Sequence, residues 1–159
     1  MAVDTSWQLV AMNDAAREFF ARVTGATVAV DGSINVLRAT LHPEGLASRI
    51  RNYVQWRAHI VRRVRRQWER TANPELLDLL AEVEAYPVPE GAEDAPEGLV
   101  DDFVTPMRVR TDLGEMSLLY ALTLFGAPRD VTLDEIAIET FFPADQATAD
   151  LLVDLARRS

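Results

Sequence analysis

The sequence predicts a single α+β domain in which a curved antiparallel sheet is covered on one face by helices. Its 159 residues correspond to about one domain, and a hydrophobic content of 48% is enough for a core. Helix-like segments dominate the first part of the chain, and three strand-like segments then follow one another. This order differs from the regular alternation of strand and helix in a parallel sheet. We therefore expect one domain over residues 1–159.

The first half of the chain is predicted to begin with a strand over residues 6–13, because Trp7, Leu9 and Ala11 would share one face. A short helix follows, capped by Asn13 or Asp14 and ended by Gly25. Two short strands are expected on either side of an Asp31-Gly32 turn.

Two helices are expected next. The first runs from about Leu46 to Thr71, a stretch without proline or glycine, and it begins after His42-Pro43. The second follows Pro74, where Asn73 can act as the N-cap. The short link between them predicts a long helical hairpin.

The second half of the chain is predicted to form a meander of three antiparallel strands and a final helix. Residues 87–102 contain three prolines, two glycines and six acidic residues, which is typical of a mobile surface loop. Strands are expected over residues 103–111, 115–126 and 134–145, and an amphipathic helix over residues 147–158.

Composition excludes several classes of protein. The net charge of −9 argues against a freestanding nucleic-acid-binding protein, because such proteins need a positive surface. The absence of cysteine and the presence of only two histidines argue against disulfides and against a thiolate or histidine-rich metal site. No segment is long and apolar enough for a signal peptide or a membrane helix. We expect a cytoplasmic protein with no cofactor and no association with the membrane.

The arginines are concentrated in one block. Residues 49–70 contain eight of the 16, and residues 71–102 contain ten acidic residues and no arginine. On a helical wheel, most of these arginines lie opposite the apolar face. We expect Glu75, Asp78 and Glu82 on the next helix to pair with Arg63, Arg66 or Arg70, each surface pair contributing roughly 0–1 kcal/mol. This interpretation is favoured over a phosphate-binding face.

Arg57 is the exception, because the wheel places it within the apolar face. One interpretation is an internal ion pair with Glu115 or Glu139. The other is that its guanidinium anchors the carboxylate of an apolar ligand. The body of that ligand would contact apolar and aromatic side chains of the helix and of the central strand: Tyr53, Val61, Val64, Leu118, Tyr120 and Leu122.

Several motifs resemble one known family. The segments NVLR (35–38), LHPEGLA (41–47), WRAH (56–59) and FGAPRDVTLDEIAIETFFPAD (125–145) are similar to the MmyB-like ligand-binding domain of bacterial helix-turn-helix regulators of the xenobiotic-response-element (XRE) type. The segment WQLVAMNDAAREFF (7–20) resembles the beginning of a PAS domain. The resemblance implies a PAS-like fold, a pocket for fatty-acid-like ligands and control of an attached DNA-binding domain. It also adds Trp56 to the candidate ligand-binding residues, since Trp56, Arg57 and His59 match the family's WRxH pattern.

The leading expectation is therefore a small-molecule sensor domain that dimerises through its helices and is not an enzyme. We expect no helix-turn-helix domain in this chain, so that DNA would be bound only through a domain absent from it. Two alternatives remain open. One is a protein-interaction module with a filled core, and the other is a small enzyme that acts on an apolar substrate with Glu139 as the base.

Overall fold

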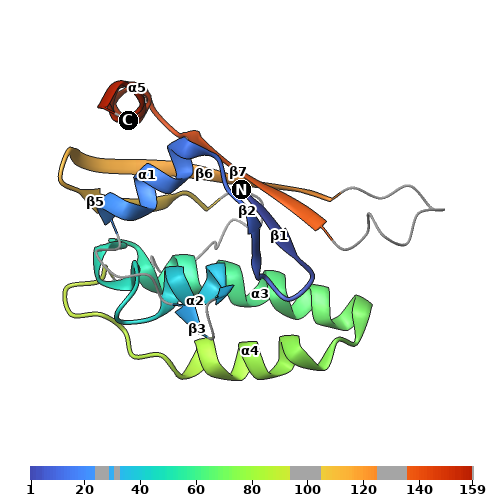
Figure 1. Ribbon diagram of the computed structural model, residues 1–159. Helices are drawn as coiled ribbons and strands as arrows, with labels where there is room; N and C mark the ends of the chain where they lie inside the picture. The colour runs from blue at the N-terminus through green and yellow to red at the C-terminus, as the bar shows by residue number, and fades with distance from the viewer. Residues whose placement is uncertain (24–28, 31–32, 94–104, 125–135, 159) are drawn as a thin grey trace.

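The structure, a computed structural model, describes residues 1–23, 29–30, 33–93, 105–124 and 136–158. In this part of the chain, five strands form an antiparallel sheet in the order β2-β1-β7-β6-β5 (Figure 1). The strands are β1 (Ala2–Asp4), β2 (Leu9–Ala11), β5 (Met107–Thr111), β6 (Gly114–Leu124) and β7 (Ile136–Pro143). The predicted α+β class with an antiparallel sheet is confirmed.

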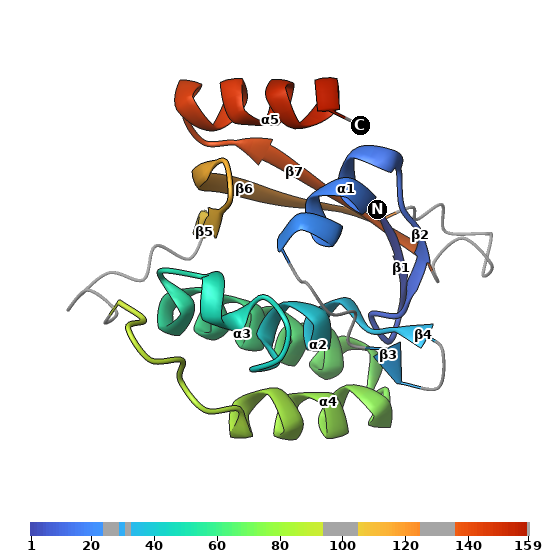
Figure 2. The ribbon, with the colours of Figure 1, turned by 60° about the vertical axis from the view of Figure 1, so that its left-hand side comes forward.

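Helices fill the remaining layers. They are α1 (Asp14–Val23), α2 (Val36–Leu41), α3 (Tyr53–Thr71), α4 (Pro74–Ala85) and α5 (Gln146–Arg158), with a 3₁₀ turn, η1, at Ala47–Arg49. In Figures 1 and 2, α2, α3 and α4 lie together below the sheet, and α5 lies above β6 and β7. Helix α3 is the layer that separates α4 from the sheet.

The N-terminal segment differs from the prediction of one strand over residues 6–13. Its strands, β1 and β2, are joined by a tight turn in which the Asp4 side chain accepts hydrogen bonds from the backbone N–H groups of Ser6 and Gln8, at 2.9 and 2.8 Å. Trp7 lies in this turn with a φ of 66° and is not part of a strand. Its indole donates a 2.9 Å hydrogen bond to Gln67 of α3, which holds the turn against that helix.

The long helix predicted from Leu46 begins seven residues later, at Tyr53. Before it starts, the chain forms η1 and then pairs Ile50 with Val109 of β5 in an isolated bridge. Asn52 ties the beginning of α3 to the same strand, because its side chain accepts from the Arg108 N–H at 3.0 Å and donates to the Pro106 carbonyl at 2.8 Å. Contacts with the sheet therefore decide where this helix begins.

The N-caps predicted for two helices, α1 and α4, are confirmed. Asn13 accepts from the N–H of Ala16 at 3.0 Å, and Asn73 accepts from the N–H of Glu75 at 3.0 Å with Pro74 in the first turn. A third capped helix, α2, was not predicted. The buried side chain of Asn35 accepts from two N–H groups of its first turn. These caps satisfy donors that the helices themselves leave free.

Two further predictions concern a turn and a loop. Strands β3 (Ala29–Val30) and β4 (Ser33–Ile34) pair as expected, but the Asp31-Gly32 turn lies outside the described residues. Residues 87–93 contain no helix or strand, and the rest of the predicted acidic loop, residues 94–102, also lies outside them.

The hydrophobic core lies between the sheet and the α2–α3–α4 layer. Its largest fully buried side chains come from all of these elements. The inner face of the sheet contributes Val3, Met107, Val109, Met116 and Leu118, and the helical layer contributes Leu41, Leu46, Ile50, Tyr53, Val64, Leu76 and Val83.

Candidate functional site

An aromatic cluster joins the middle of α3 to the inner face of the sheet. The Trp56 ring of α3 meets the Tyr120 ring of β6 edge-on, with centroids 6.0 Å apart, and Tyr120 lies 5.6 Å from Phe141 of β7. Trp56 is only 2% exposed. Aromatic pairs at this spacing add to the stability gained from burial.

Glu139 is a buried acid on the same face of the sheet. It stands opposite Leu122 in the β6–β7 register, two pairs along from Tyr120 and Phe141, and it is 4% exposed. Burial raises the pKa of its carboxyl to about 7, although the Tyr120 hydroxyl, the N-terminal amino group and Arg63 each act to lower it. Near neutral pH this carboxyl therefore exists in both its protonated and its ionised form.

Arg63 brings a positive charge to the cluster from α3. Its guanidinium carbon lies 4.8 Å from the centroid of the Tyr120 ring, a distance typical of a cation–π contact. One turn earlier on α3, the His59 ring stacks on Trp56 with centroids 5.6 Å apart. Helix α3 thus directs an indole and a guanidinium towards β6.

Three buried polar atoms of this cluster lack a hydrogen-bond partner among the described residues. They are Trp56 Nε1, the Tyr120 hydroxyl oxygen and Glu139 Oε2. The Tyr120 hydroxyl interacts electrostatically with the Glu139 carboxyl without meeting hydrogen-bond geometry. Leaving a buried polar group unsatisfied costs roughly 1–3 kcal/mol, so such atoms gathered in one place mark a candidate binding site. We call Trp56, Arg63, Tyr120 and Glu139 the polar cluster.

Arg57 lies elsewhere on α3. Its Nη1 donates a 2.6 Å hydrogen bond to the carbonyl oxygen of Tyr86, the C-cap of α4, and its guanidinium carbon is 5.3 Å from the centroid of the Tyr53 ring. The interpretation as an internal ion pair with Glu115 or Glu139 is wrong. Arg57 instead binds the end of α4, and Glu115 pairs with Arg108 at 2.8 Å.

A hydrogen-bonded group surrounds this second position. Arg38 of α2 binds Glu82 of α4 through two nitrogens, at 2.9 and 2.7 Å, and the Tyr86 hydroxyl also donates to Glu82. The Arg38 hydrogen bond lowers the pKa of the Glu82 carboxyl. Arg38 and the Tyr86 hydroxyl thus both bind Glu82, whereas the bond to Tyr86 occupies one of the five N–H donors of Arg57.

The predicted site residues therefore divide between two places. Trp56 and Tyr120 are in contact in the polar cluster, whereas Arg57 is in contact with Tyr53 and Tyr86. Tyr53, Val64 and Leu118 are fully buried, and Val61 and Leu122 are partly buried against the core. The wheel missed Arg63, which it placed on the flank of the helix. The alternation of Ala137, Glu139 and Phe141 was the signal that β7 carries an acid on its inner face.

The acidic partners of the outer arginines also differ from the prediction. Arg65 of α3 pairs with Glu84 of α4 at 2.6 Å, and both side chains are about half exposed. Glu82 binds Arg38 instead of an arginine of α3, and Glu75 accepts from the hydroxyl of Ser6. Arg65 with Glu84 and Arg51 with Glu93 are ion pairs that link the basic segment to the acidic one.

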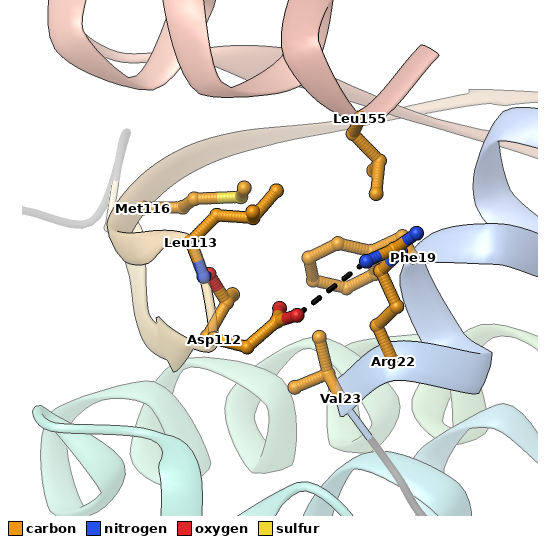
Figure 3. Close-up of a pocket in the computed structure, with 8 residues that line it drawn as sticks. Phe19, Arg22, Val23, Asp112, Leu113, Met116 and Leu155 are labelled. Carbon is orange, nitrogen blue, oxygen red and sulfur yellow. Dashed lines mark hydrogen bonds and ion pairs between the residues drawn. The ribbon is translucent and has the colours of Figure 1, made fainter. Parts of the chain in front are cut away.

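A hollow lies between α1, the β5–β6 turn and α5 (Figure 3). The empty space of about 170 Å³ there includes open solvent, so the hollow is a shallow depression and not an enclosed pocket. Arg22 and Asp112, 3.4 Å apart, form an ion pair at its side. The rest of the lining consists of Phe19, Val23, Thr111, Leu113, Met116 and Leu155, and none of the four residues of the polar cluster belongs to it.

The described residues contain no group of three or more His, Cys, Asp or Glu side chains placed to hold a metal ion. Within the same ranges, no helix combines the length and the apolar character needed to cross a membrane.

Comparison with known proteins gives one match. The family described as "MmyB-like transcription regulator ligand binding domain" matches residues 1–155, almost the whole chain. No curated protein and no solved structure matches it significantly.

Proposed function

Because the chain belongs to the family of MmyB-like ligand-binding domains of transcription regulators, we propose that it senses a small apolar carboxylic acid bound between α3 and the sheet. In this proposal the bound acid regulates a DNA-binding domain of the XRE type in the bacterial cytoplasm. The family favours this regulatory role over catalysis, although Glu139 does point inward as the enzyme alternative requires.

One observation carries the proposal. The polar cluster contains three buried polar atoms, from α3, β6 and β7, that meet no hydrogen-bond partner at full bonding geometry among the described residues. A ligand that reached them would replace the hydrogen bonds that folding leaves unmade. The neighbouring Leu118, Leu122 and Phe141 provide an apolar surface for the rest of such a molecule.

A carboxylic acid is the class of ligand that best suits these groups. The Trp56 indole can only donate, the Arg63 guanidinium carries only donors, and the Tyr120 hydroxyl can donate as well. Three donors in an apolar setting favour an acceptor with several lone pairs, such as a carboxylate. A fatty-acid-like molecule combines such a head group with an apolar tail.

Two arginines compete for the role of anchor. Arg57, the anchor proposed from the sequence, is already bonded to Tyr86 and faces α4. Arg63 stands over the ring of Tyr120, beside the unpartnered atoms. The geometry supports Arg63 better, and substitution of each arginine separates the two proposals.

The test is thermal unfolding in the presence of saturated carboxylic acids of graded chain length. A ligand that binds only the folded protein, at a hundred times its Kd, stabilises it by about 2.7 kcal/mol. For a chain of this size, we expect the melting temperature to rise by about 5–10 °C. The methyl esters of the same acids are the matched controls, because they keep the tail and lose the charge.

The variants Arg57→Ala and Arg63→Ala then identify the anchor. We expect Arg63→Ala to lose most of the shift produced by the acids, and Arg57→Ala to retain it. The opposite result would assign the anchor to Arg57. If neither the acids nor the esters raise the melting temperature of the wild-type protein, the proposed function is wrong.

A homodimer formed through helices is the second part of the proposal. Leu77 on α4 and Val153 on α5 are large apolar side chains that are 45% and 49% exposed, and a helix-mediated contact would cover them. Analytical ultracentrifugation tests this. A dimer that Leu77→Glu or Val153→Glu dissociates supports it, and a wild-type monomer at high concentration contradicts it.

A further inference from the structure

We propose that the polar cluster is a proton-linked head-group site, in which protonated Glu139 donates a hydrogen bond to the carboxylate of the ligand while Trp56, Tyr120 and Arg63 also donate to it. This inference rests on the proposed function, since it names the atoms and the protonation state that bind the acid. It assigns Glu139 to ligand binding, a role that the sequence did not suggest.

The side chains of the polar cluster meet at Tyr120. Tyr120 is the centre, because Trp56 meets its ring edge-on, Arg63 lies over it and Glu139 follows on the neighbouring strand. Trp56 Nε1, the Tyr120 hydroxyl oxygen and Glu139 Oε2 come from α3, β6 and β7, and Tyr120 and Glu139 also interact with each other. A carboxylate offers two oxygens and about four lone pairs, enough for the four donors.

Glu139 can take part only with its proton. An ionised Glu139 would place a second negative charge beside the ligand carboxylate in a buried site, which is strongly unfavourable. The protonated form instead supplies an O–H donor, and the two carboxyl groups share that proton through an O–H···O⁻ hydrogen bond. The proton comes from water when the ligand binds and returns to water when it leaves.

The groups around Glu139 shift the equilibrium between its protonated and its ionised form. Arg63 from α3 and the Met1 amino group beside β7 favour the ionised form, and the Tyr120 hydroxyl can donate to it. Burial opposes all three, and it raises the pKa of the carboxyl to about 7. The arrival of a second carboxylate favours the protonated form further.

The experiment measures the binding of decanoate by isothermal titration calorimetry between pH 6 and pH 8. Decanoate stays ionised across this range, so the ligand itself does not titrate. A single linked proton near pH 7 predicts a Kd about tenfold higher at pH 8 than at pH 6. Repeating the titration in buffers of different ionisation enthalpy counts the protons, and we expect nearly one proton taken up at pH 8.

Three variants separate the groups. Glu139→Gln keeps the size and burial of the side chain but cannot titrate, so it should remove both the pH dependence and the proton uptake. Tyr120→Phe should raise the Kd at every pH and leave the proton count unchanged. His59→Gln is the control, because His59 stacks on Trp56 and a histidine also titrates in this range. The pH dependence should persist in this variant.

The outcomes are distinguishable. If decanoate binds with a Kd and a proton count that do not depend on pH, or if Glu139→Gln retains the dependence, the inference is wrong and the proposed function survives. If decylamine binds the wild type more tightly than decanoate and improves as pH rises, Glu139 acts as an anion for a cationic ligand, and the inference is overturned. If no acid binds at either pH, the proposed function itself fails.

Discussion

At the scale of the residue, Glu139 stands out because it is an acid buried in the candidate site. It is almost completely buried, and it is not paired with Arg57. Its carboxyl pKa is raised by burial, so the folded protein binds a proton more tightly than the unfolded chain does. A carboxyl whose pKa is raised on folding makes stability fall as pH rises between its unfolded and folded values.

The first prediction follows from this fall in stability with rising pH. The pKa of Glu139 rises from 4.5 to about 7 on folding, so the free energy of unfolding should fall across that window, by roughly 3 kcal/mol in total, and change little above it. Glu139→Gln should remove this part of the pH dependence and make the protein more stable than wild type at pH 8. Urea unfolding at pH 5, 6, 7 and 8 measures it. Equal slopes in both proteins would contradict the raised pKa.

At the scale of the element, the turn between α2 and α3 shows how backbone packing overrides helix propensity. The N–H of Leu46 donates to the carbonyl of Ala39 at 2.9 Å, and Gly45 packs directly against the same carbonyl group. A β-carbon on Gly45 would stand 2.2 Å from that oxygen. The chain therefore needs glycine at this position, before η1 can form.

The second prediction concerns Gly45→Ala. The backbone must move to relieve the contact with Ala39, which should lower the free energy of unfolding by about 2 kcal/mol or more. Chemical denaturation gives the value. The matched control is Ser48→Ala, three residues along and exposed, which should change stability by less than about 0.5 kcal/mol. A neutral Gly45→Ala would show that this turn adapts at little cost.

At the scale of the whole molecule, α3 holds the two layers together. One of its sides meets α4 through Arg57 and Arg65, and another meets the sheet through Trp56 and Arg63. Its N-terminus is fixed to β5 by Asn52, whose side chain bonds to the backbone of Arg108 in that strand and of Pro106 just before it. A ligand that moved α3 against the sheet would therefore also move α4.

The third prediction tests this link between layers. Asn52→Ala leaves a buried N–H of β5 and a carbonyl without their partner, so it should cost about 1–3 kcal/mol of stability. Gln55→Ala, which removes the side chain that contacts Asn52 from within α3, should cost much less. Hydrogen exchange distinguishes a local from a global effect. Loss of protection in both α3 and β5 supports the link, and loss confined to η1 contradicts it.

The sequence alone determined the elements whose signals are local. Alternation along 115–126 predicted the strand that forms β6, Asn73-Pro74 predicted the beginning of α4, and the family motifs predicted a domain that the family match over residues 1–155 confirms. It also offered Tyr120 as a candidate site residue, because Tyr120 lies on the apolar face of its strand, and Trp56, because Trp56 matches the WRxH pattern of the family.

Only the tertiary structure decided what those faces meet. A helical wheel gives the direction of a side chain from its own axis, and it cannot tell that α3 has two buried sides, one against α4 and one against the sheet. Arg57 lies on the side of α3 that faces α4, and Arg63 lies on the side that faces the sheet. The wheel selected Arg57 because it is nearest the middle of the apolar face, but Arg63 is the arginine that reaches the polar cluster. In the same way, the bridge from Ile50 to β5 joins residues far apart in the sequence, and it sets the beginning of α3 where no local signal marks it.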